Sequence, residues 1–490
     1  MIRYICLSDL HSGALTSLLT DLSEAGDEGR LSALPKKASA LTQAFGAAFD
    51  AFLGHASASA DAPPQLILLG DVLDLQFSRR SDATASALGF LRILSETGRL
   101  SGEVIATAGN HDHAIWTDAR QSLDAHAFTL SPEDTEYREA TPAFSRAPEA
   151  RSRLLDALLK EAGFTGCDLR YPNLGFANDQ RMVFLHHGHF VEREYRLMTS
   201  LKDQLSGHRR GEIDAGKLAA ENAGWIDFAW SSFGDAAGLG RDAERLYQNL
   251  LTTTGFRRLT ANWSDKAADA LGERLPMSGN VSMREALRKL SRVGFDMTLG
   301  AFRDTERYAE VEALTPGGLE GLLWYLEGPA ARQIREELGG PQTVFRPPRD
   351  STFVFGHTHK PFSERFRVPG YGAPVKVYNT GGWTLNGPRL DNAEGAAMVL
   401  IDDQLNTASV RLFSTPRNGT VPLAHVEMLS DGSADAERFR DEIKGWLDAS
   451  ADAWRTLAKV AAEAYDLRQR YLLQLTADDY DRVQGRRAVP

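Results

Sequence analysis

The feature that most constrains this chain is a recurring pattern in which a short apolar segment ends directly in histidine, aspartate or asparagine. The clearest case is the segment 103–107, which leads into Gly109, Asn110, His111 and Asp112. Apolar segments of about four to eight residues that stop at turn residues are typical of buried strands. An amide, an imidazole and a carboxylate in consecutive positions suit metal binding and proton transfer better than a hydrophobic core. The pattern therefore predicts a buried sheet whose strands deliver polar loops to one edge.

Four further strand ends carry the same kinds of residue. Eight of the chain's twelve histidines fall in the strand-end clusters. Alternation along a strand places residues two apart on the same side, so such a pair can bind one ion together. The segments, with the polar residues that follow them, are 2–7 with Asp9 and His11, 65–69 with Gly70, Asp71 and Asp74, 181–185 with His186, His187 and His189, and 352–355 with His357 and His359.

The composition bounds the class of protein. With 490 residues the chain can form more than one domain, and 42% apolar with 25% charged residues is typical of a globular protein. A net charge of −11 argues against a general nucleic-acid-binding or anionic-membrane-binding protein. Cys6 and Cys167 are too few for a disulfide framework, and Cys6 is expected in the core. Because no transmembrane segment and no signal peptide is recognised, the expected location is the cytoplasm.

Helices are expected between and after the strands. Residues 15–60 are rich in alanine and leucine and are predicted to be helical, as are residues 86–95 and 149–162. Residues 169–177 are predicted to form a strand or a hairpin. Residues 434–475 are predicted to form a helical hairpin that either packs on the core or makes an oligomer interface.

From residue 190 to 349 the strand pattern is absent. Helix-like segments replace it, and tryptophans are concentrated among them. An insert of this length is too long for a simple loop, and we interpret it as a helical cap over the site. A packing appendage with no role in substrate contact stays the alternative. The helix-like segments are 192–205, 243–252, 283–293 and 319–338.

The strand pattern resumes at residue 352 and ends before the C-terminal helices. Residues 375–378 are predicted to form a strand that ends at Asn379. Residues 396–401 and 409–413 are predicted to form a closing hairpin, and residues 418–433 a loop.

Seven of the strand-end residues carry the donor atoms of metal ligands. One divalent ion at a hydrolytic site needs only about three or four protein ligands, so seven suggest two ions that share one carboxylate. Nitrogen and oxygen donors without a thiolate suit Mn²⁺, Fe or Zn²⁺. The seven are Asp9, His11, Asp71, Asn110, His187, His357 and His359.

These residues, in this order, resemble the five signature blocks of the calcineurin-like metallophosphoesterase superfamily. The resemblance covers residues 1 to about 189 and 350 to about 415. Any single block is a weak signal, but all five occur in order and each follows an apolar segment. The blocks are Asp9-x-His11, Gly70-Asp71-x-x-Asp74, Gly109-Asn110-His111-Asp112, His187-Gly188 and Gly356-His357-x-His359.

The resemblance implies a hydrolase that cleaves a phosphoester bond by attack of a hydroxide bridging two divalent metal ions. His111 would be the general acid that protonates the leaving oxygen. Asp74 would orient His111 and raise its pKa, and Asp112 would support the ligands from behind. The implied ligands are Asp9, His11 and His359 for the first ion, Asn110, His187 and His357 for the second, and Asp71 for both.

The roles of the other clustered histidines are less defined. His187 is taken as the ligand because it directly precedes glycine, as in the family. His186 would then face the opposite side of the strand and pack there. His189 would either contact the substrate phosphate or support the ligands, and the same two alternatives hold for His113.

The substrate is suggested by a weaker resemblance. Residues 379–383, Asn-Thr-Gly-Gly-Trp, are similar to a segment in the bacterial branch that contains UDP-2,3-diacylglucosamine hydrolases. That branch also inserts a helical lid between its last two histidine blocks. An aromatic-rich cap suits a substrate with a bulky organic or acyl group. We therefore expect a phosphodiester or pyrophosphate substrate of that kind.

Four other functions compete with this interpretation. A metal-dependent nuclease would use the same metal core, but nucleic acid demands a basic groove and this chain is acidic, so no nucleic-acid partner is expected. A protein phosphatase is disfavoured because Asp74-Leu75 lacks the Arg-Gly that follows in that branch. Phosphomonoester hydrolysis on this core stays open. A non-catalytic scaffold would have lost ligands, and all seven are present.

The implied fold class is α/β (α+β), a four-layer αββα sandwich of two facing mixed sheets with helices outside. A helical cap insert and C-terminal helices complete it, and the C-terminal helices are a candidate surface for oligomerisation. The expected organisation is 1–189 and 350–415 for the two parts of the core, 190–349 for the cap insert and 434–490 for the C-terminal extension.

Overall fold

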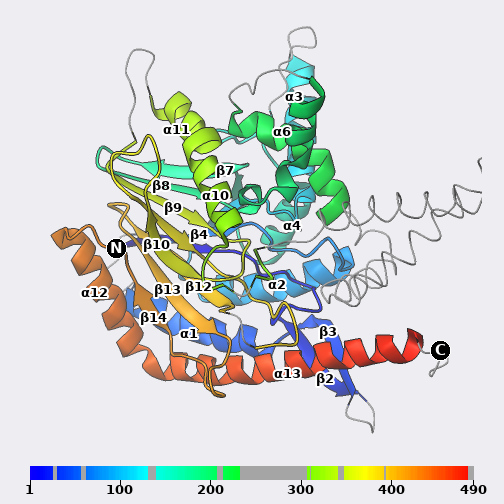
Figure 1. Ribbon diagram of the computed structural model, residues 1–490. Helices are drawn as coiled ribbons and strands as arrows, with labels where there is room; N and C mark the ends of the chain where they lie inside the picture. Colours follow the sequence, from blue (N-terminus) through cyan, green and yellow to red (C-terminus); the bar gives the residue numbers. More distant parts are fainter. Residues whose placement is uncertain are drawn as a thin grey trace, which may run out of the picture.

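Two mixed β-sheets face each other, with helices on both outer sides, in the computed structural model of the protein (Figure 1). The α/β fold class predicted from the strand pattern is confirmed. The structure describes residues 1–25, 30–56, 62–130, 139–206, 213–231, 306–309, 311–339, 347–390 and 393–483.

The larger sheet has seven strands. β1, β4, β5 and β6 run parallel to one another, and β12, β13 and β14 extend the sheet antiparallel beyond β1. Strand β14 lies in a segment that was predicted to be a loop. In sheet order the strands are β14 (His425–Glu427), β13 (Thr407–Ser414), β12 (Gly395–Asp402), β1 (Ile2–Leu7), β4 (Gln65–Leu69), β5 (Glu103–Thr107) and β6 (Gly166–Leu169).

The smaller sheet has five strands. Its central strands β8, β9 and β11 are parallel, and antiparallel strands flank them. The chain passes from the larger to the smaller sheet between β6 and β7, where a single strand or hairpin was predicted. In sheet order the strands are β10 (Phe362–Phe366), β11 (Val375–Asn379), β9 (Asp350–Phe355), β8 (Arg181–His186) and β7 (Asn173–Ala177).

Alternation along the strands explains why the two sheets stack. In β4, Ile67 and Leu69 point toward the opposite sheet, while Leu66 and Leu68 belong to the core beneath the outer helices. Side chains from both sheets thus form one closed apolar layer between them. Cys6 lies in that layer and is fully buried, as expected. The other residues of the layer are Ile105, Leu174, Val183, Leu185, Val354, Tyr378, Val399, Ile401 and Leu405.

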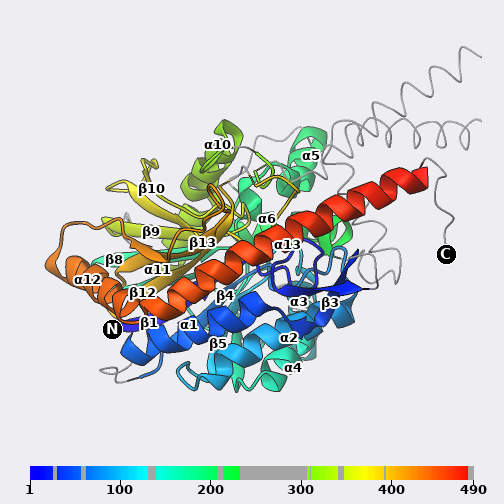
Figure 2. The same ribbon diagram turned by 90° about the horizontal axis from the view of Figure 1, so that it is seen from below.

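Helices cover the outer face of each sheet. Figure 1 shows α10 and α11 over the smaller sheet, and α1 and α13 on the far side of the larger one. Seen from below, α13 runs across α1, and the two helices pack together (Figure 2). The helices outside the insert are α1 (Ala40–Ala56), α2 (Arg80–Glu96), α3 (Ala114–Leu130), α4 (Arg153–Glu161), α12 (Ala434–Ala449) and α13 (Ala451–Val483).

The described part of the insert is helical. Tyr325 of α10 packs on Phe353 of β9, and its hydroxyl donates to Asn173 Oδ1 at 2.8 Å. The predicted helices at 243–252 and 283–293 lie outside the described residues. The elements are η2 (His189–Val191), η3 (Glu194–Arg196), α5 (Leu197–Ser206), α6 (Ala215–Ile226), the π-helix η4 (Asp227–Ser231), α10 (Pro316–Tyr325), the π-helix η6 (Leu326–Ala330) and α11 (Ala331–Leu338).

The prediction of helix throughout residues 15–60 is wrong. Strands β2 (Thr20–Ala25) and β3 (Arg30–Ala38) form an antiparallel hairpin before α1 begins. Pro35 would interrupt a helix, and Gln474 of α13 pairs with both backbone groups of Leu31 at 2.8 and 3.0 Å. A contact more than four hundred residues away therefore helps to hold the hairpin.

The predicted C-terminal helical hairpin is also wrong. Helices α12 and α13 meet near Ser450 at a wide angle instead of lying side by side (Figure 1). Both pack on α1, so the core supplies the apolar surface that a hairpin partner would have supplied. None of the described helices is long and apolar enough to cross a membrane.

Candidate metal centre

The polar strand ends of both sheets meet at one edge of the sandwich. Parallel strands of one sheet end at the same edge, so their following loops converge. The larger sheet supplies Asp9 and His11 after β1, Asp71 and Asp74 after β4, and Asn110 and His111 after β5; the smaller sheet supplies His187 after β8, and His357 and His359 after β9. All of these side chains are buried.

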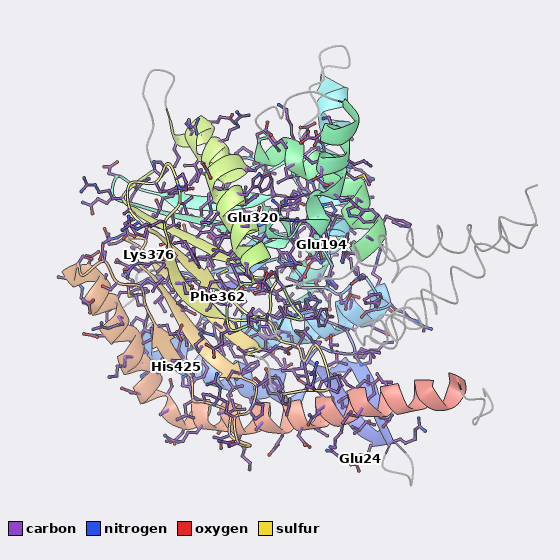
Figure 3. All side chains as sticks on the ribbon, viewed as in Figure 1. Glu24, Glu194, Glu320, Phe362, Lys376 and His425 are labelled. Atoms are coloured by element: carbon purple, nitrogen blue, oxygen red, sulfur yellow. The ribbon has the colours of Figure 1, made fainter. Side chains whose placement is uncertain are left out.

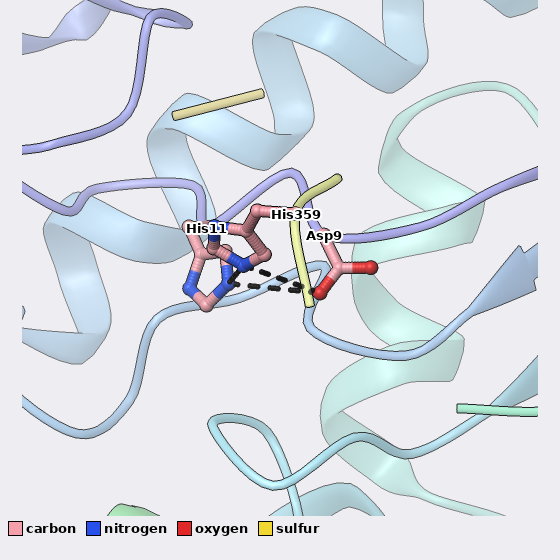
Figure 4. A group of neighbouring side chains, drawn as sticks. All are labelled: Asp9, His11 and His359. Carbon is pink, nitrogen blue, oxygen red and sulfur yellow. Dashed lines mark hydrogen bonds and ion pairs between the residues drawn. The ribbon is translucent and has the colours of Figure 1, made fainter. Parts of the chain in front are cut away.

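The first group contains Asp9, His11 and His359, and Figure 4 shows the three side chains turned toward one another. His359 Nε2 lies 3.4 Å from Asp9 Oδ1, and His11 Nε2 lies 3.9 Å from the same oxygen. The Nε2 atoms of the two imidazoles are 2.9 Å apart. These three side chains therefore present one oxygen and two nitrogens to a common point.

The second group contains Asn110, His187 and His357. The amide oxygen of Asn110 lies 3.1 Å from His187 Nε2 and 3.0 Å from His357 Nδ1. The Nδ1 atom of His187 faces the Leu69 carbonyl at 2.9 Å, which leaves Nε2 directed at the group. Two nitrogens and an amide oxygen thus converge here.

Asp71 lies between the two groups. Its Oδ2 atom is 3.4 Å from His11 Nε2 and 3.3 Å from His187 Nε2. Its Oδ1 atom accepts a hydrogen bond from the backbone of His111 at 2.8 Å. Three groups of three side chains each bring their potential ligand atoms within 4.8 Å of one another. Asp71 belongs to two of these groups, one with His11 and His111 and the other with His187 and His357.

Five of these side chains stand on left-handed backbone. The φ angles lie between +44° and +68°, a region that costs non-glycine residues about 1–3 kcal/mol each and is concentrated at functional sites. Among the described non-glycine residues, only Leu405 and Asn418 share this conformation. The five are Asp9, His11, Asp71, His357 and His359.

Close approach of the loops requires glycine at two positions. A Cβ atom on Gly70, which has φ +85°, would lie 2.6 Å from His187 Nδ1. A Cβ atom on Gly356 would collide with the Asp9 carboxylate. Glycine therefore lets the loops after β4 and β9 approach the facing ligands.

The protonation of the histidines follows from burial and from the central carboxylates. Burial lowers the pKa of His11 well below its ordinary value, and burial together with Arg307 lowers the pKa of His359 to about 4. Burial also opposes a charge on His187, but Asp71 and Asp9 outweigh it and raise the pKa to about 9. His187, His111 and His11 outweigh the effect of burial on Asp71 and hold its pKa well below the usual range. The centre thus combines two imidazoles that favour the neutral form, His11 and His359, with ionised carboxylates that attract a cation.

The donor set fits divalent metal ions. Asp71 Oδ2 is buried and accepts no hydrogen bond from the described residues, although it faces imidazoles on two sides. A buried carboxylate oxygen without a donor is costly unless a cation satisfies it. Neutral imidazole, carboxylate and amide oxygen are the ligands of Mn²⁺, Fe and Zn²⁺. The buried clusters are consistent with two ions that share Asp71.

Core residues hold His359 from behind. Its Nδ1 atom lies 2.7 Å from Thr384 Oγ1 and 3.0 Å from Asn386 Oδ1. Both residues follow the Asn-Thr-Gly-Gly-Trp segment that starts at Asn379. A hydrogen bond at Nδ1 orients the ring so that Nε2 is presented to the site.

Two residues at the start of the insert contact the second group, and sequence reasoning missed both. Glu192 is 3% exposed, and its Oε1 lies 2.8 Å from His357 Nε2. The hydroxyl of Tyr195 accepts from the amide nitrogen of Asn110 at 3.0 Å, so the amide oxygen points at the histidines. The sequence placed Glu192 at the start of a helix-like segment, where a carboxylate is ordinary; only its burial beside His357 distinguishes it.

Asp112 organises the loops. Its carboxylate accepts hydrogen bonds from four backbone N–H groups, at distances of 2.7–3.3 Å. Burial and the nearby Asp71 raise its pKa to about 6, whereas the four donors favour the ionised form. It does not join the groups of potential ligands among the described residues. The donors are the N–H groups of Gly109, Asp71, Val72 and Leu73.

His111 stands beside the groups with Asp74 behind it. The Nδ1 atom lies 3.3 Å from Asp74 Oδ1, which also accepts from the backbone of Gln76 and Phe77. Burial opposes a charge on this imidazole, but Asp71 and Asp74 outweigh it and raise the pKa of His111. A protonated imidazole can donate a proton from Nε2.

His113 and His189 lie behind the centre in a buried polar chain. His113 Nδ1 is 2.7 Å from Asp227 Oδ1, and His113 Nε2 is 3.0 Å from the Tyr171 hydroxyl. The same hydroxyl lies 3.4 Å from His189 Nε2. His186 Nδ1 accepts from the backbone of Gly188, and its ring packs against Tyr325 and Phe190. These contacts favour a supporting position for His113 and His189 over a substrate-facing one.

A large cavity lies away from the candidate ligands. It measures about 730 Å³ and opens between β10 and the β13–β14 edge, where Figure 3 labels Phe362 and His425. None of the candidate ligands lines it. The cavity is therefore separate from the candidate ligands.

The chain aligns with solved structures but matches no family model and no curated protein. Among solved structures, a dimetal phosphatase from Danio rerio aligns with 87% of this chain and 98% of that chain, at 12% sequence identity and a TM-score of 0.30.

Proposed function

We propose that this protein is a metal-dependent phosphoester hydrolase with two divalent ions, a member of the calcineurin-like metallophosphoesterase superfamily. One observation carries the proposal: Asp71 lies between two groups of buried imidazole, carboxylate and amide donors, with one carboxylate oxygen facing both. A carboxylate oxygen that faces both groups can bridge two ions about 3.5–4 Å apart, the separation found in two-metal sites. The strained backbone of five of these residues supports a functional role for the cluster.

The residues divide into two sets around Asp71. Asp9, His11 and His359 hold the first ion in this proposal, and Asn110, His187 and His357 hold the second. The ions are Mn²⁺, Fe or Zn²⁺, which accept this mixture of nitrogen and oxygen donors. When bound, they polarise the phosphoryl group and generate a nucleophile from water at neutral pH.

His111 is the proposed general acid. Its Nδ1 atom pairs with Asp74, so Nε2 is the atom that donates to the leaving oxygen in this proposal. Asp74 is fixed by two backbone N–H groups and can hold the ring in one orientation. A proton delivered from Nε2 neutralises the charge that develops on the leaving oxygen.

The bond cleaved is a phosphodiester or a pyrophosphate that carries a bulky organic or acyl group. The support is the aromatic character of the insert next to the ligands. Tyr195 packs on His357 with ring centroids 5.2 Å apart, and Trp230 packs on Tyr195 at 4.4 Å. Aromatic rings beside a polar centre suit a substrate with a large apolar part. The segment 379–383 resembles one in the branch that contains UDP-2,3-diacylglucosamine hydrolases, which supports the same substrate class.

The test is hydrolysis of bis(p-nitrophenyl) phosphate and p-nitrophenyl phosphate by chelated, desalted protein to which Mn²⁺, Zn²⁺, Mg²⁺ or no metal is returned. We expect a transition metal to restore activity, with the diester preferred. Preference for the monoester would replace the diesterase by a phosphomonoesterase. Absence of activity with every metal, together with less than one bound ion per chain, would overturn the proposal and leave a non-catalytic scaffold.

His111→Ala tests the assigned roles in the same assay. The variant should keep both ions and lose turnover by about 10²–10⁴-fold, the typical contribution of a general acid. His425→Ala is a matched control because His425 lies at the distant cavity edge. Loss of an ion from His111→Ala would show that this imidazole is a ligand instead.

A further inference from the structure

Arg307 enters the metal centre from the insert. It belongs to the described segment 306–309 and is 5% exposed. Its Nη2 atom lies 3.2 Å from His11 Nε2 and 3.9 Å from Asp71 Oδ2, and its Nη1 atom lies 3.5 Å from His111 Nε2. The guanidinium therefore lies beside His11, the shared carboxylate of Asp71 and the proposed general acid His111 at once.

The segment that carries Arg307 is anchored by neighbours of the candidate ligands. Lys360, which directly follows His359, is fully buried and donates to the carbonyls of Glu306, at 2.6 Å, and Ala309. Glu192, which pairs with His357, accepts from the backbone of Glu306 at 3.3 Å. The loops of the two histidines thus hold the backbone on both sides of Arg307.

The side chain of Glu306 fixes the segment to the next helix. Its carboxylate accepts from the backbone N–H and the hydroxyl of Thr315. The Thr315 hydroxyl in turn caps α10 through the N–H of Gly318. A segment with this many buried anchors holds its central side chain in a defined place.

A guanidinium beside two divalent ions requires an anion that interacts with the guanidinium and with the ions. Like charges at this distance repel strongly. Asp71 Oδ2, 3.9 Å from Nη2, already supplies negative charge, but both ions share that carboxylate in the loaded protein. A further anion between Arg307 and the ions therefore stabilises the position. A phosphoryl group supplies that charge, and its oxygens match the planar fork of arginine, which can form two parallel hydrogen bonds.

We infer that Arg307 is a substrate-binding residue that takes two non-bridging oxygens of the phosphoryl group, so that the insert completes the site. The inference rests on the proposed function and deepens it. It assigns the insert a direct contact with the reacting group. It also predicts that the centre binds inorganic phosphate through a residue that the five signature blocks do not contain.

The experiment compares Arg307→Ala and Arg307→Lys with the wild type and with Arg335→Ala, a matched control on the exposed face of α11. Each protein is loaded with Mn²⁺, its metal content is measured by elemental analysis, and inorganic phosphate is titrated by calorimetry. Arg307→Ala should retain two ions and bind phosphate about 10–100-fold more weakly, because hydrogen bonds to a charged group are lost. Arg307→Lys should recover part of the affinity, since lysine restores the charge without the fork. Arg335→Ala should match the wild type.

Two results would overturn the inference. Unchanged phosphate affinity in Arg307→Ala would remove the contact. A metal-loaded wild type that binds no phosphate would leave Arg307 without a ligand of this class.

Failure of the proposed function is distinguishable from failure of this inference. A wild type that binds metal and phosphate but cleaves neither ester would refute the hydrolase, and the phosphate titration would still decide the role of Arg307. Thermal unfolding of each variant identifies loss of fold, and Arg307→Lys keeps the comparison open if the alanine variant is unstable.

Discussion

The two halves of the candidate metal centre differ in what holds their side chains in place. In the first half, Thr384 and Asn386 of the core contact the outer nitrogen of His359. In the second half, Glu192 and Tyr195 at the start of the insert contact His357 and Asn110. The sandwich thus holds the outer nitrogen of His359, while the insert holds His357 and Asn110.

This difference gives the insert a role in assembling the centre. A carboxylate behind a histidine raises the basicity of the ligand more than a hydroxyl or an amide does. The second ion is therefore expected to respond most to changes in the insert, and the first ion to changes in the core.

Removing the shared ligand Asp71 should affect both ions, whichever side of the centre they occupy. Asp71→Asn should weaken both ions together and reduce turnover by about 10³-fold, since metal ions contribute several kcal/mol to transition-state stabilisation. Bound metal per chain and turnover are the measurements. Asp74→Asn is the matched control for metal content, because it lies in the same loop and should keep both ions while it reduces turnover through His111. Loss of a single ion from Asp71→Asn would show that Asp71 does not bridge them.

Breaking the insert's carboxylate support should affect one ion. Glu192→Gln should weaken the second ion by about 10–100-fold and the first ion much less, because only His357 loses its charged partner. Competition with a metal-sensitive dye can resolve the two affinities. Glu320→Gln serves as control, since this insert residue is exposed on α10 and pairs with Arg193 (Figure 3). Equal weakening of both ions would contradict the assignment of separate supports.

Breaking the core support should affect the other ion. Asn386→Ala should weaken the first ion by roughly tenfold, at the low end for an outer partner, because Thr384 still contacts His359 Nδ1. The same dye titration measures the change. A larger effect on the second ion than on the first would contradict the assignment of the core support to the first ion.

The smallest expected effect comes from one neutral hydrogen bond. Tyr195→Phe removes the hydroxyl that accepts from the Asn110 amide, which corresponds to about 1 kcal/mol, or about fivefold in affinity for the second ion. Tyr371→Phe removes a hydroxyl that bonds to the Leu326 carbonyl instead and should leave both ions unchanged. An equal effect from the two variants would indicate a general loss of stability.

The strand-end residues could be predicted because their signal is local. A short apolar segment followed by Asp9, His11 or His187 shows both the strand and the polar loop in adjacent residues. Strands β1, β4 and β5 begin and end where the pattern predicted. The meeting of the seven candidate ligands at one edge follows from the parallel arrangement of those strands, which the order of segments indicates.

The supporting residues from the insert and the β2–β3 hairpin could not be predicted, because contacts between distant residues determine their positions. Nothing near Glu192, Tyr195 or Arg307 in the sequence marks them as neighbours of a metal centre, because their positions are set by how the insert folds back on the sandwich. Hairpin β2–β3 was missed for a similar reason, since Gln474 of α13 stabilises the backbone of Leu31. The left-handed conformations could not be predicted either, because asparagine and glycine, not histidine, normally signal them.

The most direct test of the central claim is an anomalous difference map from crystals of the protein grown with Mn²⁺. The claim predicts two peaks about 3.5–4 Å apart on either side of Asp71. One should lie among Asp9, His11 and His359, and the other among Asn110, His187 and His357. A single peak, or peaks away from Asp71, would contradict the two-ion centre.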